Sequence, residues 1–285
     1  MHSLKKTSGS LNIARVDMID GMVKGMAVLE SFDTQRQRLN ATLAAQRAGI
    51  SRAAARRHLL TLAHLGYLET EDGYYWLSPK VLRFSGSYLA SSRLPRVLQP
   101  TLDRLAAQTQ QSFSAVVLDA DQVVIVARSV GYAGNSASTL AGSARVLAYG
   151  LHLGARLPAH ATSTGRILLA CQPRAAFAAW LKTGGGADGA LSGARSLPRL
   201  TSHTVTDIKK FRALVTQARL QDYCVARQEH ELGVFALAVP LRNVRGETVA
   251  ALNVVTAAER LEPDVMQHDL LPLLLDAALE LRPLL

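Results

Sequence analysis

The feature that most restricts the fold of this chain is a fixed order of helix, turn, helix and hairpin signals between residues 39 and 77. The segment LNATLAAQRA at 39–48 consists largely of good helix formers, and Gly49 follows it at a position suited to a left-handed helix end. Ser51 can then cap a second helix, SRAAARRHLLTLAHLG, by accepting a hydrogen bond from a free backbone N–H. Two helices joined by so short a turn are typical of a helix-turn-helix.

A hairpin signal comes directly after the second helix. Gly66 ends that helix, and the two segments 67–70 and 74–77 are rich in strand-forming residues. The pair Asp72-Gly73 between them favours a tight turn. A hairpin in this position is a wing, so the sequence predicts a winged helix-turn-helix domain over residues 21–78.

Two further helices are expected on either side of this motif. The first, from about Gly21 to Phe32, should brace the helix-turn-helix through a buried face made by Met22, Val23, Met26, Val28 and Leu29. Residues 1–20 before it are polar and without periodicity, so we expect a mobile arm there. Ser78-Pro79 begins the second helix, which we expect to be a linker over residues 79–95.

The distribution of charge indicates a partner for this part of the chain. No acidic residue lies between Asp33 and Glu69, whereas six arginines do: Arg36, Arg38, Arg47, Arg52, Arg56 and Arg57. A basic surface of this kind favours phosphate binding, because each neutralised phosphate releases condensed counterions. A solvated face of an ordinary helical domain would explain the charge alone equally well. The order of the helices, the turn and the hairpin makes double-stranded DNA the better hypothesis.

The second helix divides into two faces at 3.6 residues per turn. Its apolar face contains Ala55, Leu59 and Leu62. Its cationic, short-chained face contains Arg52, Ala53, Arg56 and Arg57. We predict that this second face, with Ser51, reads or positions DNA, because arginine can grip guanine in a bidentate fashion. Arg36 and Arg38 precede the motif and are predicted to touch phosphates, and Tyr74 of the wing is predicted to touch the DNA backbone.

The rest of the chain has a different electrostatic character. Residues 1–96 hold 14 Lys and Arg against 7 Asp and Glu, which leaves only +3 of the formal +10 for the remaining residues. Such asymmetry predicts a basic nucleic-acid module joined to a nearly neutral second domain, here residues 96–285.

Strand and helix patterns are mixed in this second domain, which predicts an α+β fold with a partly antiparallel sheet. Residues 131–142 are rich in Gly, Ser and Ala and are expected to form a flexible excursion. The expected strands are 115–118, 123–127, 146–149, 224–227, 234–241 and 249–255. The expected helices are 100–109, 165–170, 173–182, a long one that starts at 206–207, and 263–281.

Several kinds of chemistry have no support in the sequence. There is no dinucleotide fingerprint or phosphate loop, and His230-Glu231 lacks the second histidine of a zinc-protease helix. Ser163 has no glycine two residues before it, so a nucleophile elbow is absent. The sequence therefore predicts no enzyme, no metal and no cofactor.

The sequence also bears on the compartment. Cys171 and Cys224 are too few for a disulfide framework and suit a reducing cytoplasm. The apolar segment 270–285 is interrupted by a proline and by charged residues, so no membrane span is expected.

A ligand site is expected at the segment LPAHATSTGR, residues 157–166. Its hydroxyl groups and free backbone N–H groups meet at a helix N-terminus, where an anion such as a carboxylate would fit. For any one of these hydroxyls, simple N-capping is the better explanation from the sequence alone.

Together these segments resemble the IclR family of bacterial transcriptional regulators. The matching stretches are GISRAAARRHLLTLAHLGYLE, LGARLPAHATSTGRILLA, QDYCVARQEHELGVFALAVPL and VAALNV, and the similarity runs from about Met22 to the C-terminus. Within the family, RAAARRHLLTL, LSPKVLRF and LPAHATSTGRILLA are most similar to regulators of protocatechuate, 4-hydroxybenzoate and β-ketoadipate catabolism.

The resemblance implies a winged helix-turn-helix, a linker helix and a C-terminal effector-binding domain with a GAF/profilin-like, mainly antiparallel sheet. It also implies a cytoplasmic bacterial protein, nucleoid-associated on DNA, that acts as a homodimer or tetramer on a palindromic or repeated operator. The family's effector contacts correspond here to Ser163, Thr164, Arg227 (or its neighbour Ala226), Ala236, Asn253 and Val255. An arginine beside a pocket less polar than that of the ketoacid-binding members would suit a larger aromatic or dicarboxylic acid.

Three hypotheses follow from the sequence. The first is a transcriptional regulator whose DNA affinity is set by a small organic acid. The second is an enzyme that acts on a small carboxylic acid, with the winged helix as a DNA tether. The third is a protein that coats DNA without sequence preference.

Overall fold

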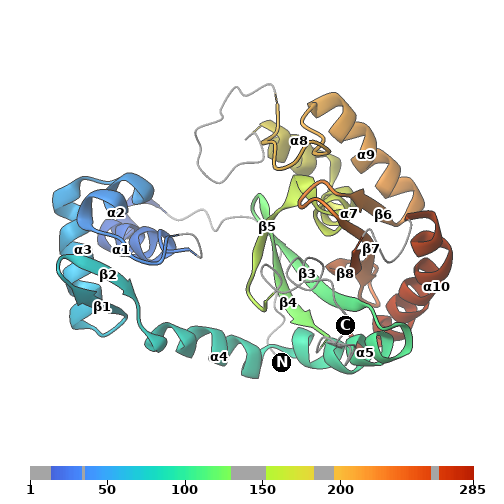
Figure 1. The fold of residues 1–285 in the computed structure, drawn as a ribbon, viewed down its shortest axis with the longest axis horizontal. Helices are drawn as coiled ribbons and strands as arrows, with labels where there is room; N and C mark the ends of the chain where they lie inside the picture. The colour runs from blue at the N-terminus through green and yellow to red at the C-terminus, as the bar shows by residue number, and fades with distance from the viewer. Residues whose placement is uncertain (1–13, 34–35, 130–151, 183–195, 258–262) are drawn as a thin grey trace. The chain divides into compact units, whose positions relative to one another are not determined.

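The computed structural model describes residues 14–33, 36–129, 152–182, 196–257 and 263–285, and it divides into two compact units, Met1–Ala90 and Ser91–Leu285 (Figure 1). The expected strand at 146–149, the excursion at 131–142 and most of the N-terminal arm lie outside the described residues.

The N-terminal unit is a winged helix-turn-helix, as the sequence predicted. Its elements are a short 3-10 helix (Arg15–Asp17), α1 (Asp20–Glu30), α2 (Ala41–Ala48), α3 (Arg52–His64), β1 (Leu68–Glu71) and β2 (Tyr74–Leu77). Asn40 caps α2 with its side chain, and Gly49 ends it in the left-handed conformation, with φ of 64°. The Ser51 hydroxyl accepts the Ala54 N–H at 3.2 Å and so begins α3. Turn and cap chemistry therefore sets both helix boundaries of the motif.

The wing is an antiparallel pair of β1 and β2. Asp72 and Gly73 connect the strands, and both have positive φ, 51° and 78°. This conformation gives the tight turn whose twist matches that of the flanking strands. The side chains of Leu68 and Tyr75 pack into the core beneath α3, which fixes the wing against the helices.

The prediction for the buried face of α1 was wrong in most of its members. Only Val28 is fully buried, and Leu29 is partly buried against the same core. Met22, Val23 and Met26 are 63%, 50% and 46% exposed, and with Ile19 at 71% they form an apolar stripe on the outer side of the helix. Periodicity shows that these residues share a face, but it does not show which side of the helix packs on α2 and α3.

The helices after the wing also differ from expectation. Pro79–Val81 is a 3-10 turn, and it is followed by α4 (Leu82–Ser91), in which no residue is buried. The linker helix was predicted to end at residue 95, but α4 ends at Ser91 and α5 runs through Pro95, from Arg93 to Thr109. Pro95 lies in the first turn of α5, where its missing N–H has no intrahelical partner to lose. Pro100 lies inside the helix, which continues because its buried side chains pack on the sheet.

The C-terminal unit contains a six-stranded sheet in which every neighbouring pair is antiparallel, in the order β5-β4-β3-β8-β7-β6. This sheet, together with the helices, confirms the α+β fold. The strands are β3 (Ser112–Asp119), β4 (Gln122–Arg128), β5 (Arg156–Pro158), β6 (Cys224–Arg227), β7 (Val234–Arg242) and β8 (Thr248–Ala257). The short β5 was not predicted.

Helices cover both faces of this sheet (Figure 1). On one face lie α5 and α10 (Pro263–Leu281), which is followed by a 3-10 turn at Arg282–Leu284. On the other face lie α7 (Ser163–Cys171), α8 (Arg174–Lys182) and α9 (Ile208–Gln221), preceded by a 3-10 turn at Ala159–Ala161. Every residue of α7 from Ser163 to Ala170 is buried. Its N-terminus therefore meets the sheet in the interior of the unit.

Candidate nucleic-acid interface and ligand site

The two faces of α3 are separated as the sequence predicted. Ala55, Leu59 and Leu62 are buried in the core of the N-terminal unit. The side chains on the opposite side are exposed, namely those of Arg52, Ala53, Arg56 and Arg57. Ser51 is exposed too, but its hydroxyl is used as the helix cap. The exposed N-terminal turns of α3 thus present three guanidinium groups beside short side chains, the arrangement that fits a major groove.

The six arginines of the acid-free window are not equivalent in the structure. Arg47 forms an ion pair with Asp33, whose carboxylate also accepts the backbone N–H of Arg36. Arg38 lies over the Trp76 ring, 4.3 Å from its centroid.

Arg38 also approaches Glu71 of the wing, at 3.7 Å. By contrast, Arg52, Arg56 and Arg57 have no acidic partner among the residues that the structure describes. The three guanidinium groups of α3 are therefore available to a phosphate or a base edge. Tyr74, at the start of β2, is exposed on the wing.

The start of α7 combines a satisfied cap with an unsatisfied hydroxyl. Thr162 is the cap, because its Oγ1 accepts the Gly165 N–H at 3.1 Å. Ser163 and Thr164 follow it and are both buried. The Ser163 Oγ has no hydrogen-bond partner among the described residues. N-capping thus explains Thr162, whereas the buried hydroxyl of Ser163 is left without a partner, as expected of a group that meets a ligand.

Three of the predicted contacts lie on the sheet face that α7 covers. Ala236 on β7 pairs with Val255 on β8, and Ala238 pairs with Asn253 one row further along. The alternation of strand residues places them on the side of Ala238 and Ala251, which pack with α7. Asn253 is buried, and its Oδ1 accepts the hydroxyl of Ser114 on β3 at 2.6 Å. The face therefore combines small apolar side chains with one polar pair.

Arg227 lies elsewhere, although the resemblance suggested it as a ligand contact. It is the last residue of β6, it is exposed, and it forms an ion pair with Asp264 at the start of α10, at 3.3 Å. Alternation along β6 turns it away from α7, whereas its neighbour Ala226 is buried and pairs with Ala236. The structure thus brings Ala226 and Ser163 to the same side of the sheet, and Arg227 to the opposite side.

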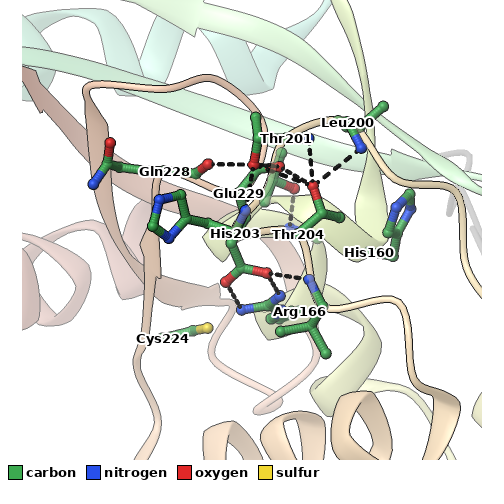
Figure 2. Close-up of polar contacts among 12 residues, drawn as sticks. His160, Arg166, Leu200, Thr201, His203, Thr204, Cys224, Gln228 and Glu229 are labelled. Carbon is green, nitrogen blue, oxygen red and sulfur yellow. Dashed lines mark hydrogen bonds and ion pairs between the residues drawn. The ribbon is translucent and has the colours of Figure 1, made fainter.

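The arginine that does lie at α7 is Arg166, which the sequence reasoning did not select. Its side chain is 1% exposed and binds Glu229 in a bidentate fashion, with 2.6 Å between Nη1 and Oε1 (Figure 2). Burial lowers the pKa of Arg166, but the hydrogen bonds and charge interactions with Glu229 and Cys224 together outweigh burial and raise the pKa above the ordinary value. The sequence signal for Arg166 was its position as the single charged residue in the apolar helix STGRILLAC. No sequence signal identified its partner Glu229, which lies 63 residues away.

The buried His160, the half-buried His230 and the Cys224 thiol lie near this ion pair. His160 lies 2.9 Å from the Pro198 carbonyl through Nε2, and burial lowers the pKa of His160. Burial and the neighbouring His160 likewise lower the pKa of His230. Both imidazoles are therefore neutral at neutral pH. Burial raises the pKa of the Cys224 thiol to about 11, so this thiol stays protonated.

Within the described ranges, no group of three or more His, Cys, Asp or Glu side chains is arranged to hold a metal ion. None of the helices described is both long enough and apolar enough to cross a bilayer.

Known proteins match the chain along nearly its whole length. Residues 22–72 match the IclR helix-turn-helix domain, and residues 86–282 match the domain described as bacterial transcriptional regulator IclR C-terminal. The p-hydroxybenzoate hydroxylase transcriptional activator of Acinetobacter baylyi is 47% identical over 275 residues, which cover 96% of this chain and 95% of that protein. The Pca operon regulatory protein of the same organism is 45% identical, with 96% and 91% covered.

A solved structure resembles the C-terminal unit. It is a double mutant of the inducer-binding domain of the PobR transcription factor from Acinetobacter, in complex with 3-hydroxybenzoic acid. It is 42% identical to this chain, covers 67% of it and 98% of its own length, and superimposes with a TM-score of 0.56.

Proposed function

The chain belongs to the IclR family of bacterial transcriptional regulators, and we propose that a hydroxylated benzoic acid bound in its C-terminal unit sets its affinity for an operator. Membership makes the chain a DNA-binding transcriptional regulator and not an enzyme, so the hypothesis of an enzyme with a DNA tether is set aside. Because its DNA partner lies there, we place the protein in the bacterial cytoplasm, on the nucleoid when bound. A fluorescent fusion that never overlaps the nucleoid would count against this placement.

For the DNA side, we propose that the N-terminal turns of α3 enter the major groove. Arg52, Arg56 and Arg57 are exposed there without acidic partners among the described residues, and Ala53 leaves room for a base edge between them. Ser51 at the start of the helix, Tyr74 on the wing, and Arg36 with Arg38 beside it would then lie near the DNA backbone. In this arrangement the contacts of α3 carry sequence preference, and those of the wing carry general affinity.

For the ligand side, the observation that carries the proposal is the buried, unpartnered hydroxyl of Ser163 at the N-terminus of α7. A carboxylate there would accept this hydroxyl and would face the positive end of the helix, where Thr164 also lies. An aromatic ring would lie over the small side chains of Ala236 and Val255. Its hydroxyl group would reach the polar pair of Asn253 and Ser114, 2.6 Å apart.

The relatives support a ligand of this chemical class. One of them is named for p-hydroxybenzoate hydroxylase, and the similar inducer-binding domain holds 3-hydroxybenzoic acid. p-Hydroxybenzoate and 3-hydroxybenzoic acid each carry a carboxylate and a hydroxyl group on one aromatic ring. The carboxylate would bind at the start of α7, and the hydroxyl group would bind the Asn253–Ser114 pair.

A thermal-shift panel tests the ligand. With 4-hydroxybenzoate, 3-hydroxybenzoate or protocatechuate at 100-fold excess over Kd, binding to the native state adds about 3 kcal/mol of stability, and we expect Tm to rise by about 5 °C or more. Aliphatic ketoacids at the same concentration should leave Tm within about 1 °C, because they cannot span both polar ends of the site.

Ser163→Ala is the matched variant for this panel. The hydroxyl has no partner, so its removal should leave the Tm of the unliganded protein unchanged or slightly raised. Affinity for the aromatic acid should nevertheless fall about 10-fold or more, because the carboxylate loses a buried donor. A wild-type protein that no aromatic acid stabilises, or a Ser163→Ala protein that binds as tightly as wild type, would contradict the proposed ligand site.

We further propose that the protein is a homodimer, or a tetramer built from dimers, through the outer stripe of α1. Ile19, Met22, Val23 and Met26 recur at helical spacing and remain largely exposed in a single chain. A contiguous apolar stripe of this kind marks an interaction surface. A second copy of the chain fits it, because paired recognition helices match the two half-sites of a palindromic operator.

Sedimentation tests the assembly. The double variant M22E/M26E should sediment as a single chain, because two charges enter the stripe, while its Tm should barely change since both side chains are exposed. Leu220→Glu provides the control, because Leu220 is exposed on α9 in the other unit. A variant M22E/M26E that keeps the mass of the wild-type assembly would exclude this interface.

A further inference from the structure

We propose that Arg166 and Glu229 are positioning residues for the ligand site, because their buried ion pair holds the start of α7 in the geometry that binds the acid. This inference rests on the proposed ligand site at Ser163. It concerns residues that do not themselves touch the acid.

Arg166 lies in the first turn of α7, close to Ser163. Arg166 lies three residues after Ser163, and its backbone N–H donates to the Thr162 carbonyl at 3.1 Å. Both residues therefore belong to the first turn of one helix, and a shift of Arg166 moves the Ser163 hydroxyl with it. The guanidinium is also held from the side of α9, where it lies 5.9 Å from the centroid of the Phe211 ring.

Glu229 connects the start of α7 to two loops. Its carboxylate accepts hydrogen bonds from Nη1 and Nη2 of Arg166 (Figure 2). The same carboxylate accepts the backbone N–H of Val205 at 3.2 Å. Its backbone carbonyl accepts the Thr204 hydroxyl at 2.7 Å. Glu229 lies in the loop between β6 and β7, whereas Thr204 and Val205 lie in the segment that leads into α9. One carboxylate thus joins the start of α7 to two separate loops.

Both loops are in turn held to each other. Thr201 donates its hydroxyl to the Gln228 carbonyl at 2.7 Å, and the Thr204 hydroxyl accepts the backbone N–H groups of Leu200 and Thr201 (Figure 2). On the other side of the same segment, the Pro198 carbonyl meets His160, just before α7. These hydrogen bonds form a network that connects both loops to the start of α7, and the Arg166–Glu229 ion pair is part of this network.

The Arg166–Glu229 ion pair is buried in apolar surroundings, where charges are costly. Ile167, Leu168 and Leu169 follow Arg166 on α7 and are all buried apolar residues, so an apolar side chain at 166 would suit simple packing. A buried ion pair adds little net stability over such packing, and the Nε of Arg166 has no partner among the described residues. A bidentate pair does fix both the position and the orientation of the two groups. Position is therefore the better explanation for the pair than stability.

A double-mutant cycle with 4-hydroxybenzoate as the probe tests the proposal on the full chain. Glu229→Gln keeps the size of the side chain but removes its charge, and we expect Kd, measured by calorimetry, to rise about 10-fold or more. Ser163→Ala in the wild-type background should weaken binding by a similar factor. In the Glu229→Gln background it should add less than about 2-fold, because a misplaced Ser163 hydroxyl has no contact left to lose.

Full additivity of the two substitutions would overturn the proposal, because a merely structural role would lower Tm and leave the contribution of Ser163 intact. Should Glu229→Gln fail to fold, Arg166→Lys carries the same cycle, because it keeps the positive charge but cannot make both contacts of the bidentate pair. A wild-type protein that binds none of the hydroxybenzoates would overturn the proposed ligand, and this inference with it. Wild-type binding combined with additive effects would overturn the positioning role alone.

Discussion

The double substitution of Arg56 and Arg57 by alanine is expected to lower operator affinity about 10²- to 10⁴-fold, because each well-placed arginine contact to a base is worth about 1–3 kcal/mol. Both side chains are exposed on α3, the proposed recognition helix, and have no acidic partner among the described residues. The fold should be unaffected, since neither packs into the core. Fluorescence anisotropy with labelled DNA from upstream of the protein's own gene, repeated over a range of salt concentrations, measures the loss.

A control with the same change in net charge separates specific contacts from general attraction. Lys209 and Arg212 are exposed on α9 in the C-terminal unit, and their replacement by alanine also removes two positive charges. We expect that variant to bind within about 3-fold of wild type, because these charges lie off the recognition surface. Equal losses in the two variants, together with equal affinity for unrelated duplexes, would favour a protein that coats DNA without sequence preference.

The second large effect is expected from Gly165→Ala at the start of α7. A Cβ at this position would lie 2.1 Å from the Ala159 carbonyl oxygen and 2.4 Å from the Ala159 Cα, both backbone atoms. The helix start would have to move away from the 3-10 turn before it, and we expect the C-terminal unit to lose more than about 3 kcal/mol of unfolding free energy. Denaturant unfolding followed by circular dichroism measures this loss, and ligand binding should disappear with it.

Gly86→Ala is the matched control for that experiment. Gly86 lies in α4, and no atom stands within 4 Å of the position that its Cβ would take. Alanine there should stabilise the N-terminal unit by about 0.5–1 kcal/mol, because it reduces the entropy that the helix loses on folding. If Gly165→Ala proved as stable as Gly86→Ala, the close approach of α7 and Ala159 would have no part in holding the site.

The parts of the fold that the sequence predicted well are those set by local chemistry. Gly49, Ser51 and the pair Asp72-Gly73 each act on residues within a few positions of themselves, through caps and turns, and each was found in the expected conformation. The final helix at 263–281 and the strand at 224–227 were also placed correctly, because turn or proline signals border both.

The parts that escaped prediction depend on contacts between distant segments. The stripe of α1 that contains Met22 and Met26 was correct as a pattern, but only the packing of the other side on α2 and α3 shows that it faces outward. Strand β5 has only three residues, and its pairing with β4 could not be inferred from so short a segment. Pro95 indicated a break but lies in a first turn, where proline is equally suited.

Prediction of the proposed ligand site divides in the same way. The motif around Ser163 and Thr164 was visible in the sequence because hydroxyls before an apolar helix mark a helix start. The partner of Arg166 was not visible, because Glu229 belongs to a loop far along the chain. The family resemblance implied Arg227 or its neighbour Ala226 as a contact. A shift of one residue along a strand moves a side chain to the other face of the sheet, and the structure places Ala226 on the face of α7.

The measurement that tests the central claim most directly is operator affinity with and without a saturating hydroxybenzoate. Ligand control requires the acid to bind two arrangements of the protein unequally, and this coupling is typically 5- to 150-fold in magnitude, that is about 1–3 kcal/mol. We expect 4-hydroxybenzoate to change the operator Kd by a factor in that range, and the operator to change the Kd of the acid by the same factor. An operator Kd that stays constant while calorimetry shows the site filled would contradict the claim that this acid controls DNA binding.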